Sequence, residues 1–410
     1  LPNRRKLLSD LHALWESNQL SGRVLLLFSY KELSHYATTL GQIGTEKIDV
    51  SLALSLTQAL VDFREEGDYS NALQIYRVSS GRFLMMTSGQ PESWVLTLGQ
   101  ALKNLNLSES YLVRISLITG AYKMPETLGD YSEESLLRHL QFVEAALLEH
   151  KPFTWFDGPM LDKRIYEKRI EDDLVRAVEN NELFVVFQEK FDFERNVIGA
   201  EALVRWEHPT LGAVSPGVFI PIAENAGLID LIDRFVAKTV INFLAERKLR
   251  SAIVVPIAIN LSVYELIDPQ VVQKLSQMCL EANVPPSSLI IEITETGFTN
   301  HTGIVISNIQ QLKNTGFKVH LDDFGTGYSS LSYLSAFDLD AIKIDISFTR
   351  FIETDHKIKS IVQAIIDISK AIGAKVIAEG VESESQMSLL LDMGCDYLQG
   401  YYLSRPKPNI

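Results

Sequence analysis

Seven polar side chains in the second half of the chain stand at or near the ends of short apolar runs that are typical of β-strands. They are Glu201, Asn260, Glu292, Asp322, Asp323, Lys343 and Glu379. Five of the seven are carboxylates. Two like charges about 5 Å apart repel by roughly 3 kcal/mol at an effective dielectric constant near 20. If the five carboxylates converge, they must therefore be protonated or bind cations.

Oxygen ligands select hard cations, so these carboxylates and the Asn260 amide favour Mg²⁺ or Mn²⁺. The sequence has no HExxH motif and no Cys/His cluster, which argues against zinc. Neighbouring side chains of a strand point to opposite faces, so Asp322 and Asp323 can serve one site only if the chain turns. Residues 324–327 (FGTG) supply that turn. A shared Asp322 is compatible with two cations, an arrangement that serves in-line displacement at phosphorus. Lys343 could instead form a Schiff base, but the many acids favour metal chemistry.

Eight strand-like runs carry these side chains, and helical patterns separate most of them. The runs cover 183–188, 199–206, 254–262, 289–296, 318–324, 341–347, 375–382 and 397–404. This alternation predicts an α/β fold, a (β/α)8 TIM-like barrel whose site lies at the carboxyl ends of the strands. Only about ten residues join the first two runs, too few for a parallel crossover. We therefore expect a modified barrel with one antiparallel strand.

The first half of the chain has a different order of elements and predicts a separate α+β domain with one mainly antiparallel sheet. We expect helices over 2–17, 49–66, 94–105 and 132–149, with Asp49 as a possible cap. Strands are expected over 23–30, 73–78, 82–87 and 111–122, the second and third forming a hairpin. We place this domain at 1–155, a charged connecting helix at 156–172 and the barrel domain at 173–410.

Charge and composition limit the binding partners and the cellular location that we expect. Lys and Arg total 38 and Asp and Glu total 52, which gives a formal net charge of −14. This balance argues against broad binding to nucleic acid or to an anionic membrane. The chain has no uninterrupted apolar run of 18 residues and no signal-peptide pattern, and Cys279 and Cys395 lie far apart. We expect a cytoplasmic, reducing location.

Seven sequence blocks resemble, in order, the EAL domain family of bacterial cyclic di-GMP phosphodiesterases. They are GAEALVRWEHP (199–209), INLS (259–262), IEITE (291–295), LDDFGTGYSSLSYL (321–334), IKID (342–345), AEGVES (378–383) and LQGYYLSRP (398–406). The resemblance covers about residues 170–410 and implies hydrolysis of cyclic di-GMP to linear pGpG. A non-catalytic cyclic di-GMP receptor and an interaction scaffold are the alternatives.

The resemblance also assigns roles to single residues. Glu201, Asn260, Glu292 and Asp322 would bind one cation, and Asp322 and Asp323 a second. Lys343 and Glu379 would orient or deprotonate the attacking water, so that these two and Glu201 form the catalytic set.

Further residues are assigned to the substrate and to a loop beside the site. Arg205 would hold a phosphate, and Gln188 and Gln399 would contact the nucleotide. Glu295 would anchor the loop 323–330, whereas Glu382 is a weaker candidate that can simply belong to a helix cap. In addition, Glu189 stands where the family usually has proline, and its charge near the pocket edge can weaken affinity.

The first half resembles GGDEF (diguanylate cyclase) domains in the order of its elements and in the opening letters LPNRR. SSGRF at 79–83 stands in place of the family's signature, and Ser29 replaces the metal-binding aspartate of the first strand. The resemblance implies a regulatory domain without cyclase activity. An upstream sensory or membrane segment could precede this domain. For the barrel domain, the EAL resemblance makes a homodimer through the barrel plausible.

Overall fold

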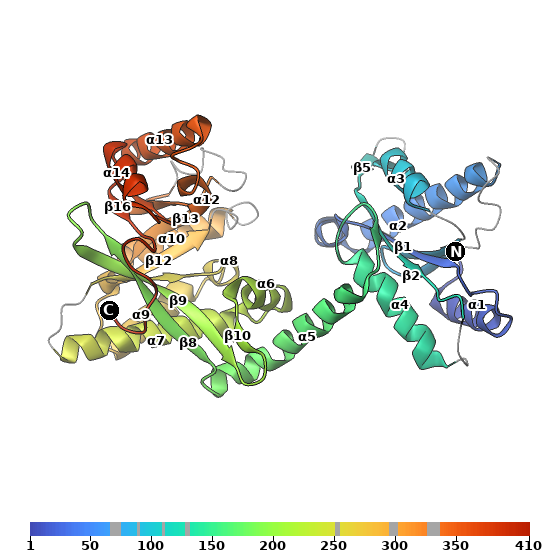
Figure 1. The fold of residues 1–410 in the computed structure, drawn as a ribbon, viewed down its shortest axis with the longest axis horizontal. Helices are drawn as coiled ribbons and strands as arrows, with labels where there is room; N and C mark the ends of the chain where they lie inside the picture. Colours follow the sequence, from blue (N-terminus) through green and yellow to red (C-terminus); the bar gives the residue numbers. More distant parts are fainter. Residues whose placement is uncertain are drawn as a thin grey trace. The chain divides into compact units, whose positions relative to one another are not determined.

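The computed structural model describes residues 1–65, 75–87, 91–108, 111–127, 132–250, 255–294, 302–325 and 337–410. The chain divides into two compact units, Leu1–Tyr166 and Glu167–Ile410 (Figure 1). A single helix, α5 (Gly158–Glu179), runs across the boundary between them. Within the described residues, every helix is too short or too polar to cross a membrane.

The first unit contains a five-stranded sheet with the order β2-β3-β1-β6-β7. Its strands are β1 (Val24–Tyr30), β2 (Tyr76–Ser79), β3 (Arg82–Thr87), β6 (Leu117–Lys123) and β7 (Thr154–Trp155). β1 is antiparallel to β3 and β6, as the α+β prediction requires. The single strand expected over 111–122 is wrong, because β5 (Tyr111–Arg114) pairs instead with β4 (Asn104–Ser108) in a separate two-stranded sheet.

Four helices cover the two faces of this sheet: α1 (Arg4–Glu16), α2 (Leu33–Glu65), α3 (Glu92–Ala101) and α4 (Glu133–Leu147). All residues of β1 are buried, because alternate side chains enter different cores. Leu26 packs with α2 and α3, whereas Leu25 packs with α1 and α4. Helix α2 begins well before the expected start and is kinked at Gly41 (φ 64°), so Asp49 lies inside it and does not cap it.

Eight strands of the second unit close into a barrel (Figure 1). They are β8 (Leu183–Phe191), β9 (Val197–His208), β11 (Ile257–Asn260), β12 (Leu289–Thr294), β13 (Lys318–Phe324), β14 (Ala341–Ile344), β15 (Lys375–Ala378) and β16 (Tyr397–Leu398). β8 is antiparallel to both of its neighbours, and the other barrel pairs are parallel. The expected TIM-like barrel with one reversed strand is confirmed. The short strand β10 (Gly212–Val214) extends the sheet beside β9.

Helices follow most barrel strands. They are α6 (Pro216–Ala226), α7 (Ile229–Leu249), α8 (Val263–Leu266), α9 (Val271–Glu281), α10 (Thr302–Thr315), α12 (Ile346–Thr349), α13 (His356–Ala371) and α14 (Glu384–Asp392), with a 3₁₀ turn, η1, at Pro286–Ser288. α6 and α7 are separate helices because Gly227 takes a left-handed conformation (φ 69°) between them. The parallel strands from β11 to β15 are buried along most of their length, because helices cover one side and the barrel interior the other, and β14 is buried throughout.

Candidate metal-binding active site

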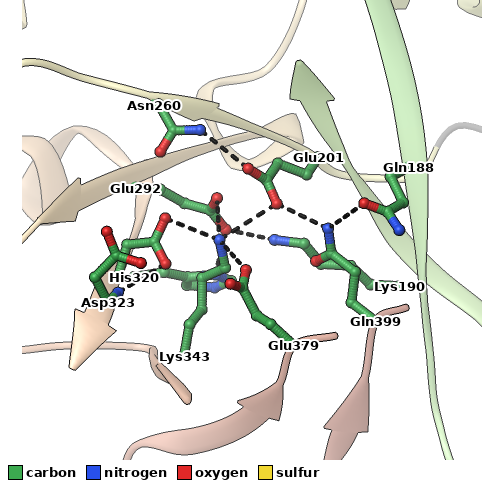
Figure 2. A network of polar contacts seen from close by, with 11 residues as sticks. Gln188, Lys190, Glu201, Asn260, Glu292, His320, Asp323, Lys343, Glu379 and Gln399 are labelled. Carbon is green, nitrogen blue, oxygen red and sulfur yellow. Dashed lines mark hydrogen bonds and ion pairs between the residues drawn. The ribbon is translucent and has the colours of Figure 1, made fainter. Parts of the chain in front are cut away.

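The carboxyl ends of the barrel strands bring the expected polar side chains to one mouth (Figure 2). Glu201 lies on β9, Asn260 ends β11, Glu292 lies on β12, Asp322 on β13 and Lys343 on β14, while Glu379 and Gln399 directly follow β15 and β16. Strand register aligns neighbouring members, since Asn260 pairs with Glu292. The geometry therefore gathers side chains that lie up to 198 positions apart in the sequence.

Lys343 occupies the centre of this cluster, and none of its surface is exposed. Its Nζ donates to Glu292 Oε2 at 2.8 Å, to Asp322 Oδ2 at 3.0 Å and to Glu201 Oε2 at 3.3 Å. The Glu379 Oε1 atom lies 2.6 Å from the same nitrogen. One ammonium group therefore contacts four carboxylates, which the sequence places on four different strands or strand ends.

Lys190 is a second buried cation at this site and is not among the residues predicted from the sequence. Its Nζ forms an ion pair with Glu292 Oε1, and the side chains are 1% and 0% exposed. The Nδ1 atom of His320 lies 3.5 Å from the same oxygen but makes no hydrogen bond within the described residues. Lys190 stands two positions after Gln188 on β8, and this period-two spacing is the signal that could have identified it.

A backbone irregularity brings Asp322 and Asp323 into the same site. The register between β13 and β14 shifts between Leu321 and Phe324, and Asp323 takes a left-handed φ of 54°. Its backbone N–H donates to Asp322 Oδ1 at 2.8 Å. The turn therefore begins at Asp323 itself, one residue earlier than the sequence analysis expected.

Two groups of three carboxylates in the described part of the chain have ligand atoms within 4.8 Å of one another. One contains Glu201, Glu292 and Asp322, and the other contains Asp322, Asp323 and Glu379. The donors are oxygen atoms, and Asp322 belongs to both groups. Such a donor set fits hard divalent cations and can hold a metal ion.

The electrostatics of the cluster reflect burial and crowding. Burial raises the pKa of Asp322 to about 6 and the pKa of Glu379 to about 8, and it also raises the pKa of Asp323. Burial opposes ionisation of Glu292 too, but Lys190 and Lys343 hold the pKa of that carboxyl well below its usual range. The two lysines thus favour the ionised form of Glu292, whereas burial outweighs the nearby positive charge at Asp322, Asp323 and Glu379.

Two amide side chains donate hydrogen bonds to the Glu201 carboxylate. Asn260 Nδ2 donates to Glu201 Oε1 at 3.0 Å, and Gln399 Nε2 donates to Glu201 Oε2 at 2.8 Å. Gln399 Nε2 also donates to Gln188 Oε1 at 3.2 Å (Figure 2). The Oε1 atom of Gln399 is buried and has no hydrogen-bond partner among the described residues, so it can accept one from a ligand.

The remaining candidates lie further out. Arg205 follows Glu201 by four positions on β9, so both lie on one face of the strand, and its guanidinium donates to Val204 O at 2.8 Å. Glu382 is exposed, and its backbone N–H donates to Gln386 Oε1 at the start of α14. Glu295 lies outside the described residues, as does the loop beyond Gly325.

The first unit has its own buried carboxylate, at Asp49. Both of its oxygens accept from the Gly81 N–H at 3.0 Å in the turn between β2 and β3. Its Oδ2 also accepts from Ser80 Oγ at 3.2 Å and from Arg77 Nη2 at 2.8 Å. Asp49 therefore ties helix α2 to the hairpin turn, and the turn itself carries no carboxylate.

A closed barrel with one reversed strand and an acidic, lysine-centred mouth defines a TIM-barrel-like domain with a candidate metal site. The model of the EAL domain family matches residues 171–406, and the chain belongs to this family. The family expected from the sequence blocks is thereby confirmed.

Individual relatives agree with this assignment. The chain is 36% identical over 253 residues to the cyclic di-GMP phosphodiesterase PdeR of Escherichia coli (strain K12), covering 62% of this chain and 38% of PdeR. It is 31% identical over 352 residues to the bifunctional diguanylate cyclase/cyclic di-GMP phosphodiesterase MucR of Pseudomonas aeruginosa, covering 82% of this chain and 50% of MucR. The chain thus spans half or less of the length of these two relatives.

A solved structure of the PaMucR phosphodiesterase in its c-di-GMP complex is similar to the barrel. The TM-score is 0.56 at 35% sequence identity, and the match covers 58% of this chain and 98% of that structure. The barrel fold and the family of the second unit therefore have independent support.

Proposed function

We propose that the barrel unit is a metal-dependent phosphodiesterase that hydrolyses cyclic di-GMP to linear pGpG. The observation that carries this proposal is the pair of carboxylate triads that share Asp322 around Lys343. Membership of the EAL domain family and similarity to named cyclic di-GMP phosphodiesterases support the same substrate.

The donor set supports two Mg²⁺ or Mn²⁺ ions. We assign the first to Glu201, Asn260, Glu292 and Asp322 and the second to Asp322 and Asp323. When bound, the cations would supply positive charge that activates water and stabilises the phosphoryl oxygens.

The protein's own groups then orient the reactants. We assign Lys343 and Glu379, which lie 2.6 Å apart, to orienting or deprotonating the attacking water, with Glu201 completing the catalytic set. Arg205 would hold a phosphate oxygen at the outer edge of the mouth. The burial and open acceptor of Gln399 support nucleotide contact by this residue and by its neighbour Gln188.

We further propose that the first unit, the GGDEF-like domain, regulates the barrel without cyclase activity. The turn at Ser80 and Gly81 offers no carboxylate to a cation, and the nearby Asp49 carboxylate is already engaged by that turn. A homodimer through the barrel stays a prediction, as does the anchoring role of Glu295.

The direct test is incubation of the purified chain with cyclic di-GMP and Mg²⁺ or Mn²⁺, with pGpG measured by chromatography. We expect turnover that EDTA abolishes and that Asp322→Ala and Glu201→Ala eliminate without loss of the fold. Tight cyclic di-GMP binding without hydrolysis in either cation would refute the proposal and would favour a non-catalytic receptor instead.

A further inference from the structure

The chain beyond Gln399 folds back onto β8 and gives this strand another partner. The Phe187 N–H donates to Lys407 O at 2.8 Å, and the Lys407 N–H donates to Phe187 O at 2.9 Å. β16 pairs with β8 four positions further along, at Phe191. Residues 404–407, here called the tail segment, therefore pair with a part of β8 that β16 does not reach.

Glu189 fastens the tail segment at both of its ends. Its Oε2 accepts a hydrogen bond from Ser404 Oγ at 3.0 Å and lies 2.9 Å from Lys407 Nζ. Lys407 thus neutralises the charge that the sequence analysis expected to act near the pocket edge. Proline, the usual residue of the family at this position, could make neither contact, so this fastening depends on the glutamate of this chain.

Hydrogen bonds connect the tail segment to the candidate site. Gln188 Nε2 donates to Ser404 O at 3.1 Å, and Gln188 Oε1 accepts from Gln399 Nε2 at 3.2 Å. Gln399 then donates to Glu201 at 2.8 Å (Figure 2). The position of Ser404 O consequently decides which end of the Gln188 amide faces Gln399, and through it how Gln399 is oriented.

We propose that Glu189 is a positioning residue, which holds the tail segment on β8 and thereby orients the two amides, Gln188 and Gln399, that contact the nucleotide. The identity of this nucleotide, cyclic di-GMP, rests on the proposed function. Glu189 itself touches no reacting group in this scheme, because it acts through Ser404 and Lys407.

The test uses a charge swap with a matched control. Lys407→Glu places a like charge opposite Glu189, whereas Glu189→Lys with Lys407→Glu restores an opposite pair, and Ser404 Oγ can accept from the new lysine. Lys375→Glu breaks a half-exposed ion pair of similar length, 2.7 Å to Asp396, where Lys375 begins β15. Three quantities are measured as readouts: hydrogen exchange at the Phe187 amide, the Kd of cyclic di-GMP in EDTA, and KM in Mg²⁺, with kcat recorded as a reference.

We expect Lys407→Glu to accelerate exchange at the Phe187 amide and to weaken cyclic di-GMP binding about fivefold, the effect of losing one half-exposed ion pair. KM should rise by a similar factor while kcat stays within about twofold. The swapped double variant should restore all three quantities, and Lys375→Glu should change none of them.

Faster exchange at Phe187 with unchanged cyclic di-GMP affinity would overturn the positioning role and leave the tail segment a purely structural element. Three outcomes would overturn the role of Glu189 in holding the tail segment. They are unchanged hydrogen exchange at Phe187 in Lys407→Glu, no recovery in the swapped double variant, and an equal loss of cyclic di-GMP affinity in Lys375→Glu. A wild-type chain that neither binds nor hydrolyses cyclic di-GMP would refute the proposed function separately, because the exchange measurement needs no nucleotide.

Discussion

Replacing Lys190 by methionine tests whether the second buried lysine holds the acidic mouth together. Lys190 and Glu292 are almost completely buried, so methionine keeps the apolar volume of the side chain and removes the charge. Among the described residues, Glu292 then retains one cationic partner of ordinary hydrogen-bond length, Lys343, 2.8 Å from its other oxygen. We expect the barrel to lose stability in the absence of divalent cations.

The magnitude follows from burial. Removing one partner of a buried ion pair costs about 3–5 kcal/mol, because the remaining charge stays desolvated. The remaining contact with Lys343 places Lys190→Met at the lower end, about 3 kcal/mol. A unit of this size loses about 2–4 °C in Tm per kcal/mol, so the barrel transition should fall by roughly 6–12 °C.

Scanning calorimetry in EDTA on the wild type, Lys190→Met, Glu292→Gln and the double variant measures this interaction. The double variant leaves no unpaired charge between these two positions, so its loss should be at least about 2 kcal/mol smaller than the sum of the single losses. Lys375→Met, at an ion pair whose lysine is 58% exposed, serves as the control and should change stability by less than about 1 kcal/mol. Single losses that add within about 0.5 kcal/mol would refute the reasoning.

Other predictions follow from the same structure. Burial raises the pKa of Asp233 to about 7, so the folded state binds a proton that the unfolded chain releases. The free energy of unfolding should therefore fall, by roughly 4 kcal/mol at most, as pH rises from about 4 to 7. In denaturant titrations, Asp233→Asn should flatten this pH dependence. An unchanged slope would contradict this. Asp49→Asn should destabilise the first unit by about 2–3 kcal/mol and accelerate exchange at the Gly81 amide, whereas equal exchange rates would refute the anchoring role of Asp49. Mg²⁺ at about one hundred times its Kd should stabilise the barrel by about 2.7 kcal/mol, and this gain should disappear in Asp322→Asn; an equal gain in the variant would place the cation elsewhere.

The left-handed backbone conformation of Asp323 shapes the candidate metal site. A left-handed φ at a residue other than glycine costs free energy, and here it places two consecutive aspartates in one site. The strand pattern alone puts Asp322 and Asp323 on opposite faces. Thus local backbone geometry makes the second carboxylate triad possible.

Much of the barrel could be predicted from the sequence because its information is local. Alternating apolar runs and helical repeats identify the eight strands, and a connection too short for a crossover identifies the reversed one. A polar residue at or near the end of an apolar run can be identified in the same way, as with Asn260 at the end of β11 and Glu292 near the end of β12. In the first unit the sequence pattern predicted less. Helix α2 starts earlier than expected. Residues 111–122 form parts of two strands, because strand pairing is decided by contacts outside the segment.

Only the tertiary structure decided which charged side chains form ion pairs with one another. Lys190 meets Glu292 across 102 positions and Glu189 meets Lys407 across the closure of the barrel, and no local pattern encodes either pair. Asp49 likewise appears as a helix cap in sequence, yet it is the anchor of a hairpin turn. The types of residue determined what chemistry was available, whereas the register of strands distant in sequence determined which charges lie buried together and can hold a metal ion between them.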